Sequence, residues 1–171
     1  GGLDTFIGII ESYHKKYCPD SVFEPEITYV SFCNPEQEAE QIEKYISTGY
    51  FKSIDVCGGE NVQPFEMYLP LYRKAEQYHL TKRMHVGESG SAEDIRRAVD
   101  ILNLDEVHHG INAAASTEVM RFLADNRIQL NVCPSSNVML GYGADYHPSF
   151  AQHKAMAEEL VPYLRKLMNW K

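Results

Sequence analysis

The chain has 171 residues and carries 24 acidic against 16 basic side chains, which gives a net charge of −8. Hydrophobic residues make up 44% and charged residues 23%, an ordinary composition for a globular domain. An acidic surface repels a phosphate backbone, so a nucleic-acid partner is not expected, and no apolar run approaches the roughly 20 residues that span a bilayer.

The cysteines favour an intracellular location. Cys18, Cys33, Cys57 and Cys133 lie far apart and form no C-x-x-C pair, so a structural zinc site built on thiolates is not expected. Three of the four end apolar, strand-like runs, which is typical of buried reduced thiols in a cytosolic protein. We therefore expect a cytoplasmic protein without a membrane partner, organised as a single domain over residues 1–171.

Patterns typical of helices and strands alternate along the chain. The spacing of apolar residues from Leu3 to Lys16 predicts an amphipathic helix. Strands are predicted after it over residues 27–33, 53–56, 83–86, 106–109 and 129–133, and helices over residues 35–47, 64–79, 91–102, 116–126 and 150–170. Asn34 and Ser91 stand where helix N-caps are expected.

This strict alternation predicts an α/β fold. Repeated units of roughly 25 residues indicate parallel strands joined by right-handed helical crossovers. The pattern fits a (β/α)₈ barrel or a doubly wound sheet. A complete barrel has eight strands and about 250 residues, so five predicted strands would form a partial TIM-type barrel. The first two strands and the last strand of that barrel would then be absent.

Polar or glycine-rich segments follow four of the predicted strands. They are residues 55–60 (DVCGGE), 85–88 (HVGE), 108–110 (HHG) and 133–137 (CPSSN). In parallel α/β folds, functional residues gather just beyond the carboxyl ends of the strands. Four such ends at one face of a single predicted sheet therefore indicate a functional site there.

These segments resemble, in order and spacing, four motifs of the adenosine deaminase family of metal-dependent hydrolases. The matching segments are residues 55–60 with Asp-Leu-x-Gly-x-Glu, 84–90 with His-Ala-Gly-Glu, 107–110 with Gly-His-Gly, and 133–137 with Cys-Pro-x-Ser-Asn. Val86 stands in place of the family's alanine, and His108 in place of its first glycine. The resemblance covers roughly residues 27–145 and implies the family's partial barrel for this chain.

The resemblance implies hydrolytic deamination of adenosine or a related aminopurine, giving an inosine-type product and ammonia, with one Zn²⁺ as cofactor. His85 would be a metal ligand, Glu88 the proton donor to a ring nitrogen, and His109 the base or electrostatic residue. Gly58 would contact the purine through its backbone. The residue types suit these roles, because a neutral imidazole binds zinc well and a nearby carboxylic acid can transfer protons.

Structural interpretations are favoured for other residues near these strand ends. His108 adjoins His109 and should point to the opposite side of the strand, where a structural role is more readily expected. Asp55 and Glu60 are expected to organise their loop rather than to take part in the chemistry. A nucleotide substrate would need extra Arg or Lys side chains to bind its phosphate, and the sequence shows none near the four strand ends. A purine nucleoside or base is therefore expected as substrate rather than a nucleotide.

The family's other metal ligands have no counterpart in this sequence, which contains neither a His-x-His pair nor an Asp-Asp pair. A catalytic zinc needs about three protein ligands. We therefore expect the chain to be a piece of a longer polypeptide and to be inactive by itself. Open barrel edges could then favour self-association or a complementing chain.

Two alternatives remain at this stage. The first is a non-catalytic or split family member that binds a nucleoside or a partner protein, and the absent ligands motivate it. The second is a different metal hydrolase on the same barrel. Such hydrolases rely on a carboxylated lysine or another histidine pair, and neither can be placed in this sequence.

Overall fold

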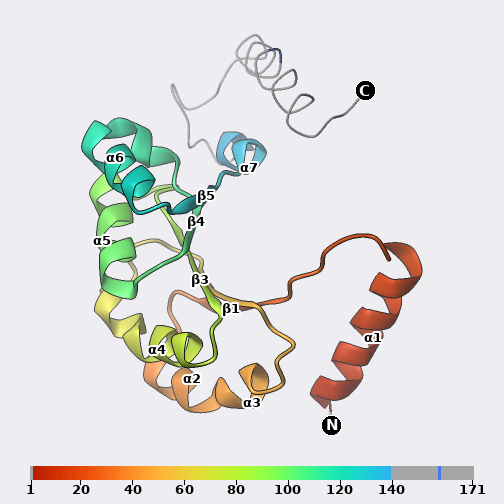
Figure 1. The fold of residues 1–171 in the computed structure, drawn as a ribbon. Helices are drawn as coiled ribbons and strands as arrows, with labels where there is room; N and C mark the ends of the chain where they lie inside the picture. Colours follow the sequence, from red (N-terminus) through yellow and green to blue (C-terminus); the bar gives the residue numbers. More distant parts are fainter. Residues whose placement is uncertain (1, 140–157, 159–171) are drawn as a thin grey trace. The chain divides into compact units, whose positions relative to one another are not determined.

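The computed structural model of the protein describes residues 2–139 and Glu158 (Figure 1). Two compact units divide the chain, residues 1–132 and residues 133–171, and each is described by itself. Apart from Glu158, the predicted helix over residues 150–170 lies outside the described residues. Among the helices that are described, none is both long and apolar enough to span a bilayer.

The first unit alternates helices and strands as predicted. Its strands are β1 (Glu26–Val30), β2 (Ser53–Cys57), β3 (Thr81–Val86), β4 (Glu106–His109) and β5 (Gln129–Asn131). Its helices are α1 (Gly2–Tyr17), α2 (Pro35–Gln41), α3 (Glu43–Ile46), η1 (Phe65–Tyr68), α4 (Leu69–Gln77), α5 (Ala92–Leu102), η2 (Ile111–Ala115) and α6 (Thr117–Asp125). The helix predicted over residues 35–47 is interrupted at Ile42.

Side-chain caps explain where two of the helices begin. The Oδ1 atom of Asn34 accepts hydrogen bonds from the backbone N–H groups of Glu36 and Gln37, at 3.2 and 3.4 Å. Ser91 and Asp94 form a reciprocal capping box at the start of α5. Both predicted caps are therefore confirmed, and each supplies an acceptor for N–H groups that have no partner inside the first helical turn.

The five strands form one parallel sheet in the order β1-β2-β3-β4-β5. A doubly wound sheet reverses its strand order at a switch point, and this sheet has no reversal. Helices α2, α4, α5 and α6 follow the sheet along its outer face (Figure 1). The arrangement is that of a barrel wall, so the predicted partial TIM-type barrel is confirmed and the doubly wound alternative is excluded.

The two faces of the sheet differ in polarity. Apolar side chains at alternate positions of β2, β3 and β4 are buried in the core with the helices, namely Ile54, Val56, Met84, Val86 and Val107. On the opposite face, the strand register places Arg83 beside Glu106 and His85 beside His108. Since alternate residues of a strand point to opposite faces, this polar face corresponds to the barrel interior and leads up to the strand ends.

Gly87, directly after β3, should tolerate no side chain. Its φ is +78°, and a Cβ added there would lie 2.3 Å from Cδ1 of Ile95. We expect Gly87→Ala to lower the free energy of unfolding by about 3 kcal/mol, because left-handed backbone strain adds to overpacking. Urea unfolding measures this loss. Gly49→Ala is the matched control, since Gly49 has φ +67° but open space around its Cβ position; equal losses in both variants would contradict the packing explanation.

Candidate active site

Three of the four predicted polar segments meet at the carboxyl ends of neighbouring strands in the first unit. Residues 55–60 run from β2 into its following loop, residues 85–88 end β3, and residues 108–110 end β4. The fourth segment, residues 133–137, belongs to the second unit. It leads into the short helix α7 (Pro134–Met139), and the strand predicted over residues 129–133 ends at Asn131.

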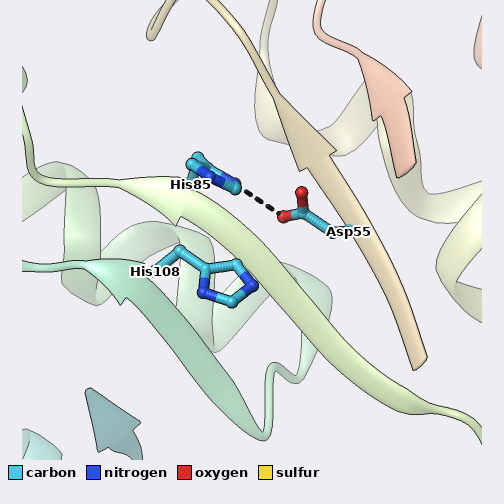
Figure 2. Close-up of side chains that lie close together, drawn as sticks. All are labelled: Asp55, His85 and His108. Atoms are coloured by element: carbon cyan, nitrogen blue, oxygen red, sulfur yellow. Dashed lines mark hydrogen bonds and ion pairs between the residues drawn. The ribbon is translucent and has the colours of Figure 1, made fainter. Parts of the chain in front are cut away.

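A histidine and an aspartate on adjacent strands form the centre of the site (Figure 2). The Nδ1 atom of His85 donates to Oδ1 of Asp55 over 2.9 Å, because an ionised carboxylate can only accept. Asp55 is almost fully buried, whereas the side chain of His85 is 33% exposed. The second ring nitrogen, Nε2, is therefore the atom that His85 could offer to a metal ion, with Asp55 fixing the ring orientation.

The surroundings of His85 also change its affinity for protons. Burial lowers the pKa of His85, but the hydrogen bond and negative charge of Asp55 outweigh that effect. The charges of Glu26 and Glu88 act in the same direction, so the pKa is raised overall. A metal ion would have to displace any proton held at Nε2, which makes metal binding dependent on pH.

Glu88 and His109 form a second pair next to the first. Oε1 of Glu88 lies 3.3 Å from Nδ1 of His109, and both side chains are largely buried. The ring centroids of His109 and His85 are 5.3 Å apart. The structure thus brings together the metal-ligand candidate, the proton-donor candidate and the electrostatic candidate, although their chemical roles remain predictions.

His108 was predicted to point to the opposite side of the strand from His109, but both rings lie near the site. The ring centroid of His108 lies 4.7 Å from that of His85, so both neighbouring histidines approach the same ring. The reason is that β4 ends at His109, whose φ of +66° lies in the left-handed region. Alternation of side chains holds only for extended backbone, so it does not carry over to this residue.

The site contains side chains that fit a cation. Among the described residues, ligand-type atoms of Asp55, His85 and His108 all lie within 4.8 Å of one another. Oδ2 of Asp55 is buried without a hydrogen-bond partner in the described residues, a costly state that a cation would relieve, whereas Nε2 of His108 faces Oε1 of Glu26 at 3.7 Å. Since Oδ1 of Asp55 already accepts from Nδ1 of His85, Asp55 could orient that ring while His85 offers Nε2 to an ion.

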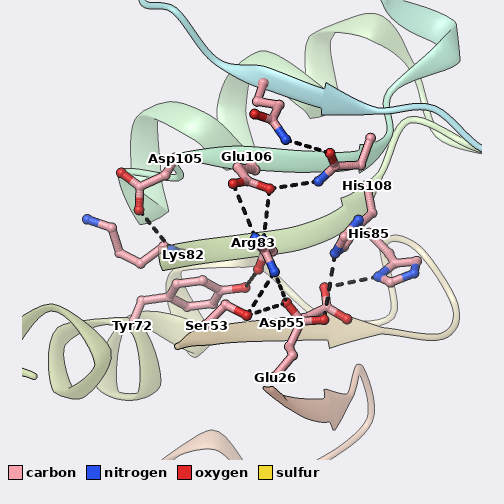
Figure 3. Close-up of polar contacts among 12 residues, drawn as sticks. Glu26, Ser53, Asp55, Tyr72, Lys82, Arg83, His85, Asp105, Glu106 and His108 are labelled. Carbon is pink, nitrogen blue, oxygen red and sulfur yellow. Dashed lines mark hydrogen bonds and ion pairs between the residues drawn. The ribbon is translucent and has the colours of Figure 1, made fainter. Parts of the chain in front are cut away.

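A network of ion pairs lies on the same sheet face (Figure 3). The guanidinium of Arg83 donates to both carboxylate oxygens of Glu106, at 2.8 and 3.3 Å. It also donates to Oε2 of Glu26 at 3.1 Å and to Oγ of Ser53 at 2.9 Å. The network joins β1, β2, β3 and β4. This ion-pair network was not predicted from the sequence. Its only sign there is a charged residue at alternate positions of two otherwise apolar strands.

Glu26 should make the fold sensitive to acid. Burial raises the pKa of Glu26, but hydrogen bonds from His108, Ser53 and Arg83 lower it to about 2. The folded-state pKa is therefore below the unfolded one, so Glu26 stabilises the fold near neutral pH. That contribution is lost as the pH falls from about 4.5 to about 2 and amounts to on the order of 3 kcal/mol.

The measurement is urea unfolding of the wild-type chain and Glu26→Gln at pH 6 and at pH 3. The variant should be clearly less stable at pH 6, and the difference should shrink at pH 3. Glu24→Gln, an exposed position two residues earlier, is the control and should change little at either pH. A difference for Glu26→Gln that stays constant with pH would contradict the charge-based explanation.

The segment after β2 has two structural features. Gly58 is exposed and has φ +106°, and a Cβ there would lie only 3.1 Å from Oγ of Ser31. Glycine is therefore required by the backbone, while its contact with a purine stays a prediction. Glu60 accepts backbone hydrogen bonds from residues 87–90, so it anchors the loop after β3, a different loop from the one that the sequence predicted.

A parallel sheet in consecutive strand order, with an Asp–His pair and a Glu–His pair near the carboxyl ends of its strands, is typical of barrel proteins whose functional site lies at that edge. The family model for adenosine deaminase matches residues 29–152. This chain belongs to the adenosine deaminase family.

Curated proteins that are similar in sequence to this chain are named as deaminases. A putative adenosine/adenine deaminase of Treponema pallidum is 38% identical over 138 residues, which is 81% of this chain and 46% of that relative. An adenosine deaminase of Clostridium kluyveri is 33% identical over 120 residues, 69% of this chain and 33% of that relative. The chain therefore spans less than half the length of these curated relatives.

Solved structures support the fold. The crystal structure of an adenine deaminase from Arthrobacter aurescens superposes with a TM-score of 0.71 at 23% identity, over 86% of this chain and 46% of that one. A Burkholderia ambifaria amidohydrolase with bound Zn superposes with a TM-score of 0.63 at 22% identity, over 76% of this chain and 37% of that one. At these identities, the likeness establishes the shared barrel architecture.

Proposed function

We propose that the polypeptide to which this chain belongs is a zinc-dependent deaminase that hydrolyses adenosine or a related aminopurine to the inosine-type product and ammonia. One observation carries the proposal. The carboxylate of Glu88 and the imidazole of His109 are 3.3 Å apart and lie beside the oriented ring of His85 at the carboxyl edge of the sheet. The names of the Treponema and Clostridium relatives support the same activity.

His85 would hold the zinc ion through Nε2, with its ring fixed by Asp55. When bound, zinc supplies a Lewis acid that makes water a competent nucleophile at neutral pH. About three protein ligands are needed for such a site. We propose that the remaining ligands come from a His-x-His pair and an aspartate in the rest of the polypeptide, so that the 171-residue chain alone is inactive.

Glu88 and His109 would handle the charge changes on the purine. As water adds to the carbon that bears the amino group, Glu88 gives its proton to the adjacent ring nitrogen. His109, largely buried and paired with Glu88, would accept a proton from the water or stabilise the oxygen that becomes negative. The amino group then takes up the proton lost by the water and leaves as ammonia. The new hydroxyl group gives its proton back to the Glu88 carboxylate as the C=O bond forms, and the ring nitrogen keeps the donated proton.

Gly58 would bind the substrate. Its backbone is exposed at the end of β2, and the lack of a Cβ permits close approach of a planar ring. A nucleoside or base is favoured over a nucleotide, because extra Arg or Lys side chains for a phosphate are not found near the strand ends. The adenosine/adenine name of the Treponema relative supports this choice.

The test is to express the complete encoded polypeptide with zinc and to measure ammonia release from adenosine, adenine and AMP. Turnover of adenosine or adenine, abolished by a chelator and restored by zinc, would support the proposal. A folded protein that holds zinc but releases no ammonia from any of the three would reject it. That outcome would favour a non-catalytic or split family member.

We also propose that residues 1–171 belong to one barrel domain, because the family match runs across the junction between the two compact units.

A cytoplasmic location is supported by the free thiols of Cys18, Cys33 and Cys57, which persist in a reducing compartment. The three thiols predicted to be buried, those of Cys33, Cys57 and Cys133, are only partly buried. Self-association through the sheet edges is a further proposal that size-exclusion chromatography at several concentrations would test.

A further inference from the structure

We infer that Glu60 is a positioning residue for the reaction, because its carboxylate fixes the backbone of the loop that carries Glu88. The inference rests on the proposed function and adds a residue to it. Glu60 stands at the end of the segment after β2, whereas Glu88 follows β3. The two are therefore neighbours across adjacent strands rather than along the chain.

The carboxylate of Glu60 accepts hydrogen bonds from four consecutive backbone N–H groups. Oε2 accepts from Gly87 at 2.7 Å and from Gly90 at 3.0 Å. Oε1 accepts from Glu88 and Ser89, both at 2.8 Å. Successive N–H groups that converge on one anion form a backbone nest, and hydrogen bonds to an ionised acceptor are about twice as strong as neutral ones.

The same loop is also held by Asn112, in the 3₁₀ turn after β4. Its Nδ2 atom donates to the carbonyl of Gly90 at 2.7 Å and to that of Glu88 at 3.2 Å. Its backbone N–H donates to the carbonyl of Gly87 at 3.0 Å. Both the N–H and the C=O groups of the loop are therefore anchored, and Glu88 is attached to a fixed backbone.

The carboxylate of Glu60 also packs closely against the loop. A Cβ added to Gly90 would lie 2.5 Å from Oε2 of Glu60, so a side chain at this position would push the carboxylate away. With four N–H groups already bound, Glu60 acts through Glu88 and not on the substrate. Catalytic groups must be placed accurately, since a misplacement of about 1 Å can cost about 100-fold in rate.

The experiment compares Glu60→Gln with wild type in the complete, zinc-loaded polypeptide. A glutamine keeps the size but offers one acceptor oxygen and turns two donor hydrogens toward the nest. We expect kcat to fall about 100-fold, with KM for the purine and zinc content unchanged. Glu66→Gln, at an exposed glutamate six residues further along, is the matched control and should leave kcat unchanged.

Amide hydrogen exchange gives a readout that does not depend on activity. Exchange at residues 87–90 should accelerate in Glu60→Gln and stay as in wild type in Glu66→Gln. Unchanged exchange, or an unchanged kcat, would overturn the inference. A higher KM with an unchanged kcat would also overturn it, because Glu60 would then serve the Gly58 segment instead.

A second variant covers the case in which Glu60→Gln fails to fold. Asn112→Ala removes the other anchor and should also lower kcat while leaving KM unchanged; a normal kcat would count against positioning. Different results would reject the proposed function and the role of Glu60. A wild-type protein without deaminase activity rejects the proposed function. Amide exchange at residues 87–90 that is as slow in Glu60→Gln as in wild type rejects the anchoring of this loop by Glu60.

Discussion

Glu88→Gln is expected to lower kcat of the complete, zinc-loaded polypeptide by about 10²- to 10⁴-fold, the usual range for loss of a general acid. Glutamine has nearly the same shape, but it cannot donate a proton to the purine ring nitrogen. Because the same loss should appear in kcat/KM, the missing interaction would belong to the transition state and not to ground-state binding. The measurement is initial-rate kinetics of ammonia release from adenosine.

Zinc content and thermal unfolding of the Glu88→Gln protein show whether the variant is otherwise intact, and both should match wild type. Glu118→Gln, at an exposed position in the first turn of α6, is the control for a loss of one negative charge. Unchanged deamination by the Glu88 variant would remove the proton-donor role. A loss of zinc together with activity would instead place Glu88 in the metal site.

Asp55→Asn is expected to weaken zinc binding by about 10- to 100-fold, the range observed when a residue that orients a metal-bound histidine is changed. Asp55 is almost fully buried and accepts from Nδ1 of His85 over 2.9 Å. A neutral amide is a poorer acceptor, so the ring loses both its orientation and the charge that increases its basicity. Competition with a chromophoric chelator measures the zinc affinity.

A second measurement separates the electrostatic part of this effect. Since Asp55 raises the pKa of His85 against the effect of burial, Asp55→Asn should make His85 titrate at lower pH in the metal-free protein, as followed by NMR. Asp100→Asn, an exposed aspartate on α5, is the control for both measurements. Wild-type zinc affinity in the Asp55 variant would exclude the orienting role.

Elements with strong local signals could be predicted before any contact was known. The capping box of Ser91 and Asp94 and the apolar spacing behind it define α5 within one residue. The strand over residues 106–109 is predicted with its observed bounds. The break at Ile42 was not predicted, because the periodic pattern runs through it and no proline or glycine marks an interruption.

The site was only partly predictable. His85, Glu88 and His109 follow from the rule that functional residues lie beyond the carboxyl ends of parallel strands. The approach of His108 to His85 was missed, because it depends on the register that places the two residues side by side on β3 and β4. The contacts of Asn112 were also missed, since nothing in its sequence neighbourhood marks an amide that binds a loop 22 to 24 residues away.

The alternation alone left a barrel and a doubly wound sheet open, so the sequence by itself determined only that alternation and the identity of the polar residues at the strand ends. These depend on local propensity and on periodicity, which each segment carries independently. Only the tertiary structure decided that Asp55 pairs with Nδ1 of His85, and that Glu60 binds the loop carrying Glu88. Such pairings depend on the register between strands about 30 residues apart, and register is a property of the packed sheet.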